Sequence, residues 1–530
     1  MGQNPHRQAC TLRTPKLGEC PMSEALAISC KDLEFRYANS STSTISGINL
    51  DIKKGEFIVI SGPSGSGKTT FARCLNGLAP RFWEGEISGT ISLNGHEIAS
   101  LDIGTIGARL ATVFQDPRSQ FFMTNTDSEI AFGCANQGMS REQTLTRVAA
   151  AYQTMAMEDL KNRSLFTLSS GQLQKIAIGS CYATNPDIYL FDEPSANLDL
   201  GATKKLTEVL RTLKNRGKTI IVIEHRLFYL TDLLDRFIVF NHGGISATYT
   251  RTQTHALDEQ SLANHGLRIF DLRKLSCKTS KSQTGTSQLS SEANGIGIDN
   301  LRFSRAQRSN KPRAFTLGPI NAKAVSGEVI AIVGDNGAGK TTLARICCGL
   351  EKESDGKILI NGKHHTPTHR LGKATLVVQD SDYQLFSDSV ADELSMGTQK
   401  LTKTRQEILA QLGLEQFTDT HPQALSRGQK QRLTIACAIA SQAQILFLDE
   451  PTSGLDKHNM TVVAQLVKDM ASSGRLVFLI SHDFEFLCAC ATRIWVMHEG
   501  KIIKDQSMSD QAMAVLRGQW NEKVKTGGLS

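Results

Sequence analysis

Two segments of the sequence have the residue types and spacing needed to hold phosphate groups. Residues 62–69 read GPSGSGKT and residues 334–341 read GDNGAGKT. In such a segment the glycines let backbone N–H groups turn toward phosphate oxygens, and a lysine reaches the outer phosphates. Lys68 and Lys340 are therefore candidates to bind the β- and γ-phosphates of a nucleotide. Thr69 and Thr341 are candidates to ligate Mg²⁺.

Pairs of carboxylates follow two apolar runs further along the chain. Asp192 and Glu193 end the first run, and Asp449 and Glu450 end the second. An Asp at the end of a strand can hold Mg²⁺ directly or through water, and the next Glu can orient or deprotonate an attacking water. Solvated acids at a strand end would not explain why the pair recurs in register with the other motifs. The residues predict a phosphate-loop ATPase with two sites.

The second half of the chain repeats the first. LSSGQ (168–172) recurs 257 residues later as LSRGQ (425–429), and LFDEP (190–194) recurs at the same spacing as FLDEP (447–451). Repeat proteins built from small units have periods of about 20–50 residues. The much longer period indicates duplication of a whole domain.

Each copy must contain elements that position these residues. Short β-branched runs at 56–61 and 329–333 lead into the phosphate loops, and helical patterns follow at 69–78 and 341–350. Further apolar strands are expected at 187–191 and 219–223, with counterparts at 444–448 and 475–480. Strands that alternate with helices predict an α/β fold with a largely parallel sheet.

The domain boundaries are predicted from composition. We expect domains over residues 25–250 and 296–515, a disordered tail over 1–24, and a C-terminal tail over 516–530. Residues 251–295 are predicted to be a linker, because residues 277–293 are rich in Ser, Thr and Gln and poor in large apolar side chains. Residues 250–276 still carry apolar positions, so they are also candidates for a terminal element of the first domain.

Several further motifs resemble those of ABC ATPases. They are LSSGQ and LSRGQ, SANLD (195–199) and TSGLD (452–456), the histidines His225 and His482, and the glutamines Gln115 and Gln379. Their order matches that family throughout residues 26–250 and 296–510. The resemblance implies two domains, each with a RecA-like α/β core, an antiparallel β subdomain and a helical subdomain. It also implies head-to-tail pairing, so that ATP on one half's phosphate loop is capped by the other half's signature.

The motifs and the resemblance together give a set of candidate site residues. In the implied roles Glu193 and Glu450 act on water, the histidines contact the γ-phosphate and the glutamines sense it. The catalytic candidates are Glu193, Glu450, His225 and His482. The ATP-binding candidates are Tyr37, Gly62, Ser64, Gly65, Ser66, Gly67, Lys68, Thr69, Thr70, Gln115, Ser169, Gly171, Gln172, Gly334, Asn336, Gly337, Ala338, Gly339, Lys340, Thr341, Thr342, Gln379, Ser426, Gly428 and Gln429. The Mg²⁺ candidates are Thr69, Gln115, Asp192, Thr341, Gln379 and Asp449.

One position departs from the family pattern. An aromatic residue before the core usually stacks on adenine, and Tyr37 fits that role in the first half. Arg305 stands at the matching position of the second half. A guanidinium plane can also stack on a base. We expect both sites to hydrolyse ATP and the second to bind it more weakly.

Some segments resemble the ATPase subunits of energy-coupling-factor (ECF) importers, which take up vitamins and metal ions. These are 80–95, 115–133, 224–226 and 379–394. The resemblance implies a membrane scaffold (T component) and a small substrate-binding S component as partners, and a place on the cytoplasmic side of the cell membrane. Phe121, Phe122, Leu385 and Phe386 would then lie near the groove for the scaffold, or else pack inside the helical subdomain. The transported substrate is left open.

Two other classes are weighed against this one. A soluble tandem ABC translation factor would carry a long, strongly charged helical linker, and this linker is short and rich in Ser and Thr. A fused ATPase of a sugar or peptide importer often has a damaged second site, and the motifs of this one look intact.

The composition adds three limits. A net charge of +7 is small for 530 residues, so no nucleic-acid partner is expected. No apolar run reaches the roughly 18–20 residues that span a bilayer, so a membrane role requires partner chains. None of the 12 cysteines forms a CxxC pair, so reduced and mostly buried thiols are expected.

Overall fold

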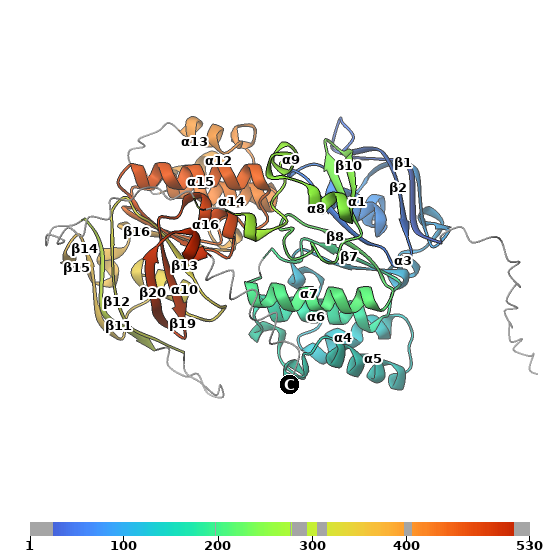
Figure 1. The fold of residues 1–530 in the computed structure, drawn as a ribbon, viewed down its shortest axis with the longest axis horizontal. Helices are drawn as coiled ribbons and strands as arrows, with labels where there is room; N and C mark the ends of the chain where they lie inside the picture. Colours follow the sequence, from blue (N-terminus) through green and yellow to red (C-terminus); the bar gives the residue numbers. More distant parts are fainter. Residues whose placement is uncertain are drawn as a thin grey trace, which may run out of the picture.

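The computed structural model of the chain describes residues 25–196, 198–275, 277, 294–304, 315–396 and 405–513. Figure 1 shows two halves side by side, the first from blue to green and the second from yellow to red. The predicted tails, most of residues 278–295 and Arg305 lie outside the described residues.

A six-stranded sheet forms the centre of each half. Five of its strands are parallel, and one antiparallel strand forms an edge. The strands, in sheet order, are β10 (Gly244–Thr250), β9 (Arg236–Asn241), β3 (Phe57–Ser61), β8 (Thr219–Ile223), β7 (Ile188–Asp192) and β6 (Leu110–Val113) in the first half, and β16 (Ala374–Val377), β17 (Ile445–Asp449), β18 (Leu476–Ile480), β13 (Val329–Val333), β19 (Arg493–His498) and β20 (Lys501–Ser507) in the second. Every residue of β3, β7, β8, β13, β17 and β18 is buried. These strands are continuous apolar runs because both faces of the sheet are covered.

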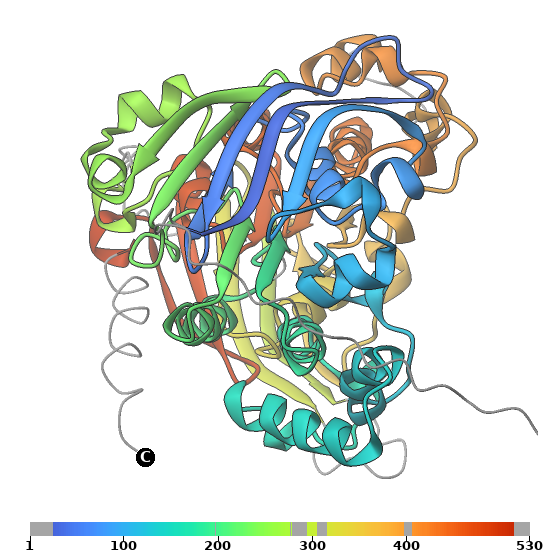
Figure 2. The same ribbon diagram turned by 90° about the vertical axis from the view of Figure 1, so that its right-hand side faces the viewer.

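A second, antiparallel sheet packs near each phosphate loop. Its strands, in sheet order, are β2 (Ile45–Lys53), β1 (Leu26–Tyr37), β4 (Gly85–Leu93) and β5 (His96–Glu97) in the first half, and β12 (Thr316–Val325), β11 (Gly295–Ser304), β14 (Asp355–Ile360) and β15 (Lys363–His364) in the second. Buried and exposed residues alternate along β2, as expected for a sheet with one wet face. Figure 2 shows the first half's sheet in blue, in front of the parallel sheet.

Helices cover the sheets and form a separate layer in each half. The helices of the first half are α1 (Lys68–Leu75), α2 (Leu78–Arg81), α3 (Ile103–Arg109), α4 (Thr126–Asn136), α5 (Arg141–Thr154), α6 (Ser170–Ala183), α7 (Leu200–Asn215), α8 (Arg251–Ala256) and α9 (Glu259–Asn264). Those of the second are α10 (Lys340–Cys347), α11 (Pro367–Arg370), α12 (Val390–Ser395), α13 (Arg405–Gln411), α14 (Arg427–Ala440), α15 (Lys457–Ser472) and α16 (Phe484–Cys490). In both views α4 and α5 lie at the lower end of the molecule and α12 and α13 at the upper end. The helical layers of the two halves therefore lie at opposite ends of the molecule. The predicted α/β fold with two tandem domains is confirmed.

Residues 265–275 and Cys277, which fall in the range predicted as a linker, pack against the second half. Ile269, Leu272 and Cys277 belong to the hydrophobic core of the second half. In Figure 1 the light-green segment after α9 lies between the halves. The range predicted as a linker, 251–295, also contains α8 and α9.

The cysteines are mostly buried thiols, with one exception to the expectation. Eight described cysteines are free, and six of them are buried. Cys277 and Cys488 are joined by a disulfide, with their Cα atoms 4.7 Å apart. The expectation that all thiols are reduced is therefore wrong at this pair, because folding brings two distant residues together. No helix among the described residues is long and apolar enough to cross a membrane.

Candidate functional site

The first phosphate loop lies between β3 and α1, where the sequence places it. Gly67 has φ 94°, and a Cβ there would lie 2.6 Å from Ile45 Cγ2, so only glycine fits. The buried Lys68 donates hydrogen bonds to the carbonyls of Gly62 and Pro63, at 2.9 and 2.8 Å. Burial lowers the pKa of Lys68. The ammonium group is thus held over the loop whose N–H groups would bind phosphate.

The second phosphate loop repeats this arrangement between β13 and α10. Lys340 donates to the carbonyls of Gly334 and Asp335, at 2.7 and 3.0 Å, and burial lowers its pKa. The hydroxyl of Thr341 donates to Asp449 Oδ2 at 2.6 Å. The two predicted Mg²⁺ ligands of this half therefore lie in contact.

The first half's strand-end aspartate also fits a metal. Asp192 is buried, and its Oδ1 has no hydrogen-bond partner among the described residues. Burial, reinforced by the neighbouring Glu193, raises the pKa of Asp192 to about 7. A buried carboxylate oxygen without a partner is costly, and a divalent cation would satisfy it. Asp192 and Asp449 are thus placed to hold Mg²⁺ at the two loops.

The glutamates that follow adopt an unusual backbone conformation. Glu193 and Glu450 have φ of 45° and 51°, in the left-handed region that is strained for residues other than glycine. Their N–H groups donate to Ile223 O and Ile480 O, at 2.8 Å each. These bonds to the neighbouring strand β8 or β18 fix the position of both candidate catalytic carboxylates.

The predicted glutamine and histidine lie beside the glutamate in the first half. Gln115 Nε2 donates to Glu193 Oε2 at 2.5 Å, and His225 Nε2 lies 3.4 Å from Glu193 Oε1. In the second half His482 Nε2 lies 3.8 Å from Glu450 Oε1. Burial, assisted by Lys340, lowers the pKa of His482 to about 3, so this imidazole is neutral near pH 7.

Each site is completed by the loop of the other half. Ser64 N donates to Asp456 Oδ2 at 2.6 Å, and Asn336 N donates to Asp199 Oδ2 at 2.9 Å. A Cβ on Gly454 would lie 3.2 Å from Glu193 Oε2. The reciprocal contacts of SANLD and TSGLD with the opposite phosphate loops give the head-to-tail pairing that the resemblance implied.

The signature residues are placed less directly. Ser169 and Gln172 form a capping box at the start of α6, and Ser426 and Gln429 form the same box at α14. Ser170, one position after the predicted Ser169, lines a cavity of about 330 Å³ with the second phosphate loop. Gln379, Glu450 and His482 line it too; its lining shows none of Ser169, Gly171 and Gln172. The described contacts do not join Ser426, Gly428 or Gln429 to the first loop.

An aromatic residue that sequence reasoning missed lies at the second site. Phe315 lines the same cavity, and a Cβ on Gly339 would lie 3.1 Å from Phe315 Cζ. In the first half Tyr37 lies against α1, where its hydroxyl is 3.1 Å from Thr70 Oγ1 and accepts from Arg73 Nη1 at 2.8 Å. Phe315 stands ten positions after Arg305, just before β12, so motif alignment could not find it. Phe315 is thus a further candidate to contact the base at this site, and weaker binding there stays a prediction.

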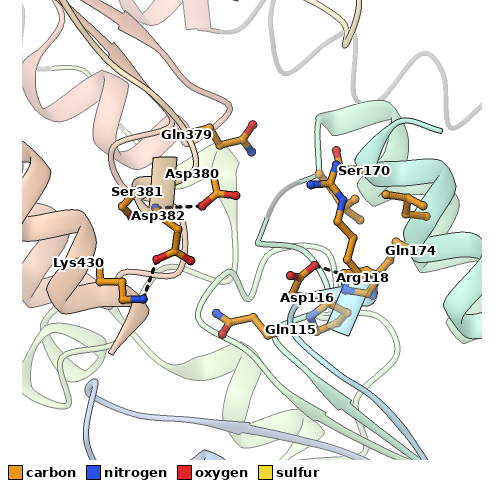
Figure 3. Close-up of a pocket in the computed structure, with 14 residues that line it drawn as sticks. Gln115, Asp116, Arg118, Ser170, Gln174, Gln379, Asp380, Ser381, Asp382 and Lys430 are labelled. Carbon is orange, nitrogen blue, oxygen red and sulfur yellow. Dashed lines mark hydrogen bonds and ion pairs between the residues drawn. The ribbon is translucent and has the colours of Figure 1, made fainter. Parts of the chain in front are cut away.

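Another cavity lies where the two glutamine segments face each other. Figure 3 shows Gln115, Asp116 and Arg118 on one side and Gln379, Asp380 and Asp382 on the other. Lys430 Nζ pairs with Asp382 at 2.6 Å. Both halves therefore contribute charged groups to one central cavity, of about 300 Å³.

Solved structures and sequence relatives agree with this geometry. A structure titled "RNase-L Inhibitor" is 22% identical, with a TM-score of 0.62, covering 92% of this chain and 93% of that chain. This likeness shows the tandem fold. A Treponema denticola protein is 38% identical over 90% of this chain and 96% of its own length. A Methanosarcina mazei protein is 30% identical over 90% of this chain and 88% of its own length. Both are named "Putative ABC transporter ATP-binding protein".

A family model described as "ABC transporter" matches residues 45–196 and again residues 317–453. Each match spans a phosphate loop, a signature and a strand-end carboxylate pair. ATPase domains of this family bind ATP with Mg²⁺ and hydrolyse it. With two matched domains, reciprocal loop contacts and relatives that cover 90% of its length, this chain belongs to the ABC transporter family as a tandem ATPase.

Proposed function

We propose that this chain powers the import of a micronutrient by an ECF-type transporter. Hydrolysis of ATP at two composite sites would drive closure and opening of the two halves, a two-state change that can be passed to membrane partners. The partners would be a T-type scaffold and a small S component. The chain would sit on the cytoplasmic side of the membrane through these partners.

The observation that carries the proposal is a pair of exposed phenylalanines. Phe122 and Phe386 are each 73% exposed. They follow Gln115 and Gln379 by seven residues, so they occupy equivalent positions in the two halves. Exposed aromatic residues that recur at equivalent positions of the two halves are candidates for contacts with a partner, since aromatic residues are enriched at interfaces.

Both phenylalanines are held in place by a buried glutamate. Glu129 Oε2 accepts from Phe122 N at 3.0 Å and Met123 N at 2.8 Å. Glu393 Oε2 accepts from Phe386 N at 2.9 Å and Ser387 N at 2.8 Å. The exposed rings therefore stand on a fixed backbone, as a docking surface requires.

The neighbouring apolar residues differ in burial. Leu385 is buried among residues of the second helical layer, and Phe121 packs against the core of the first half. Phe122 and Phe386 face outward. In each half, one residue of the pair packs internally and the next is exposed, which supports the exposed one as a contact for the scaffold.

Two further observations support a transporter role. The relatives described above carry the name of transporter ATP-binding proteins. The segments 115–133 and 379–394, which resemble ECF ATPases, contain the exposed phenylalanines and their glutamate clamps.

The test is affinity purification of the full chain from its native cells in a mild detergent. A double variant, Phe122→Ser with Phe386→Ser, is compared with the wild type by mass spectrometry of the bound proteins. The control is Ile503→Ser, because Ile503 is 54% exposed on the edge strand β20. We expect one multi-helix scaffold and small membrane proteins with the wild type and the control, and their loss with the double variant.

Other outcomes would replace the proposal. A pair of conventional permeases with a soluble binding protein would identify a sugar or peptide importer. Ribosomes without a membrane protein would identify a translation factor.

A further inference from the structure

The residue after the predicted histidine differs in charge between the halves. Arg226 follows His225, and Asp483 follows His482, at equivalent positions. Arg226 is 8% exposed and Asp483 is 4% exposed. A buried charge is stable only when it is paired, so each must have a partner that accounts for its presence.

Arg226 reaches from the first half to the second half's catalytic carboxylate. Its Nη2 lies 4.0 Å from Glu450 Oε2 and makes no hydrogen bond within the described part of the chain. Its Nη1 donates to Leu198 O at 3.5 Å. Leu198 precedes Asp199, which accepts from Asn336 N in the second phosphate loop. Arg226 thus stands beside a loop that already touches the second site.

The backbone around Arg226 is held by a buried acid. Glu224 Oε1 accepts from His225 N at 2.8 Å and from Arg226 N at 3.1 Å. Its Oε2 accepts from Tyr229 Oη at 2.8 Å and from Ser195 N at 3.2 Å. The guanidinium is therefore carried on a fixed support.

The equivalent residue of the second half has a different neighbour. Asp483 Oδ2 accepts from Arg268 Nη1 at 2.5 Å and from Thr452 Oγ1 at 2.9 Å. Although burial opposes ionisation, Arg268 and Arg226 hold the pKa of Asp483 at about 2. Asp483 is itself negative and is paired with Arg268. It therefore cannot place a positive charge beside Glu193, as Arg226 does beside Glu450.

We propose that Arg226 is a positioning residue for the second ATP site, where it acts from the other half on Glu450. Its guanidinium orients the Glu450 carboxylate, whose other near neighbours are Ser481 Oγ at 3.4 Å and His482 Nε2 at 3.8 Å. The two sites are therefore inequivalent by construction. The inference rests on ATP hydrolysis by this family and does not depend on the import proposed above.

The experiment measures each site separately in the full chain. Glu193→Gln disables the first site and Glu450→Gln the second, and phosphate release gives kcat and KM of the site that remains. Into each background we place Arg226→Met, which keeps the apolar stem without the charge, and Arg226→Lys. Loss of a group that orients a catalytic residue typically costs about 10–100-fold in activity.

We expect Arg226→Met to lower kcat of the second site about tenfold with little change in KM, and to change the first site less than about twofold. Arg226→Lys should restore most of that kcat, since it returns the charge. An equal loss at both sites, or an equal loss with Met and Lys, would overturn the proposal.

Arg268→Ala is the matched control, because Arg268 is also buried and also crosses between the halves, but binds Asp483 and Leu455 O instead of Glu450. Selective loss of the second site with this variant too would show that any loosened contact has the effect, and would also overturn the proposal. If Arg226→Met does not fold, Arg226→Lys decides: second-site kcat near the wild-type value supports the proposal, and loss at both sites contradicts it.

Discussion

At the strand ends, adjacent carboxylates, of which Asp192, Asp449 and Glu450 are buried, carry charge that the fold does not neutralise by itself. Asp192 ends β7 and Glu193 follows it, and Asp449 ends β17 and Glu450 follows it. Burial raises the pKa of Asp192 and of Glu450 to about 7 each. These groups destabilise the metal-free chain, and Mg²⁺ would relieve that cost at the aspartates. Function here opposes stability, as is common at active sites.

Replacement of Asp192 should therefore stabilise the metal-free chain. With a pKa of about 7, the folded chain keeps a proton that the unfolded chain loses above about pH 4. Stability from this group is present at low pH and is lost as pH rises toward 7. We expect Asp192→Asn to stabilise the chain more at pH 8 than at pH 5, by about 2 kcal/mol. Melting curves without Mg²⁺ test this, and a pH-independent difference would contradict it.

Phe315 should contribute to nucleotide binding at the second site. Stacking of a base on an aromatic ring is worth about 1–3 kcal/mol, which corresponds to about tenfold or more in affinity. We expect Phe315→Ala to weaken ATP binding about tenfold in a Lys68→Ala background, measured by fluorescent nucleotide titration. Phe315→Tyr is the matched control and should bind normally. Equal affinity of the Ala and Tyr variants would show that Phe315 does not touch the base.

At the scale of elements, one glutamate in each half fixes the loop that leads from Gln115 to α4 or from Gln379 to α12. Glu129 and Glu393 lie inside α4 and α12, and each accepts from two backbone N–H groups of the preceding loop. Helix and loop are thereby locked together. A movement of the helical layer would carry the exposed phenylalanine with it, which is how closure of the halves could reach a partner.

Loss of the clamp should loosen the loop while the domain stays folded. Glu393→Ala leaves two N–H groups unpaired, at a cost of about 1–3 kcal/mol. We expect a lower melting temperature, faster proteolysis within residues 384–389, and weaker recovery of membrane partners. Glu393→Gln keeps an acceptor and should be milder. Glu415→Ala, at an exposed acid on the same helical layer, should match the wild type. If Glu393→Ala recovers the same membrane partners as the wild type, the hydrogen bonds of Glu393 are not required for docking.

At the scale of the molecule, the halves are joined by more than covalent continuity. Arg268 is 2% exposed and donates both to Asp483 and to Leu455 O. Ile269 and Leu272 enter the second core, and Cys277 N donates to Asp510 Oδ1 at 2.8 Å. The segment after α9 therefore ties the first half to the second next to Asp456, which touches the first phosphate loop.

Removal of Arg268 should weaken this attachment. Breaking a buried pair by removing one partner costs about 3–5 kcal/mol, because a buried charge is left alone. We expect Arg268→Ala to lower the melting temperature of the second half in calorimetry. Arg273→Ala is the control on the same segment, since Arg273 is 82% exposed and its pair with Asp271 should contribute little. Equal curves for the two variants would mean that Arg268 does not join the halves.

Most of the candidate site residues were predicted from local sequence motifs. The phosphate loops and the strand-end carboxylates were predicted from residues that are contiguous in sequence, and they lie where their strands and helices required. The contacts of SANLD and TSGLD with the opposite phosphate loops were not predicted. Phe315 was missed because its position depends on how β12 approaches the loop. Ser170 lines the cavity at the second phosphate loop, while Ser169 caps α6. The contact of Ser169 with nucleotide stays a prediction.

The sequence by itself determined the two α/β domains and the phosphate loops, because these depend on local spacing and on apolar runs that must be buried. Only the tertiary structure decided which side chains cross between the halves. Arg226 and Glu450 are 224 positions apart, and Arg268 and Asp483 are 215 apart. No local pattern encodes such pairs, since they depend on the packing of two complete domains. The inequivalence of the two ATP sites arises at that level.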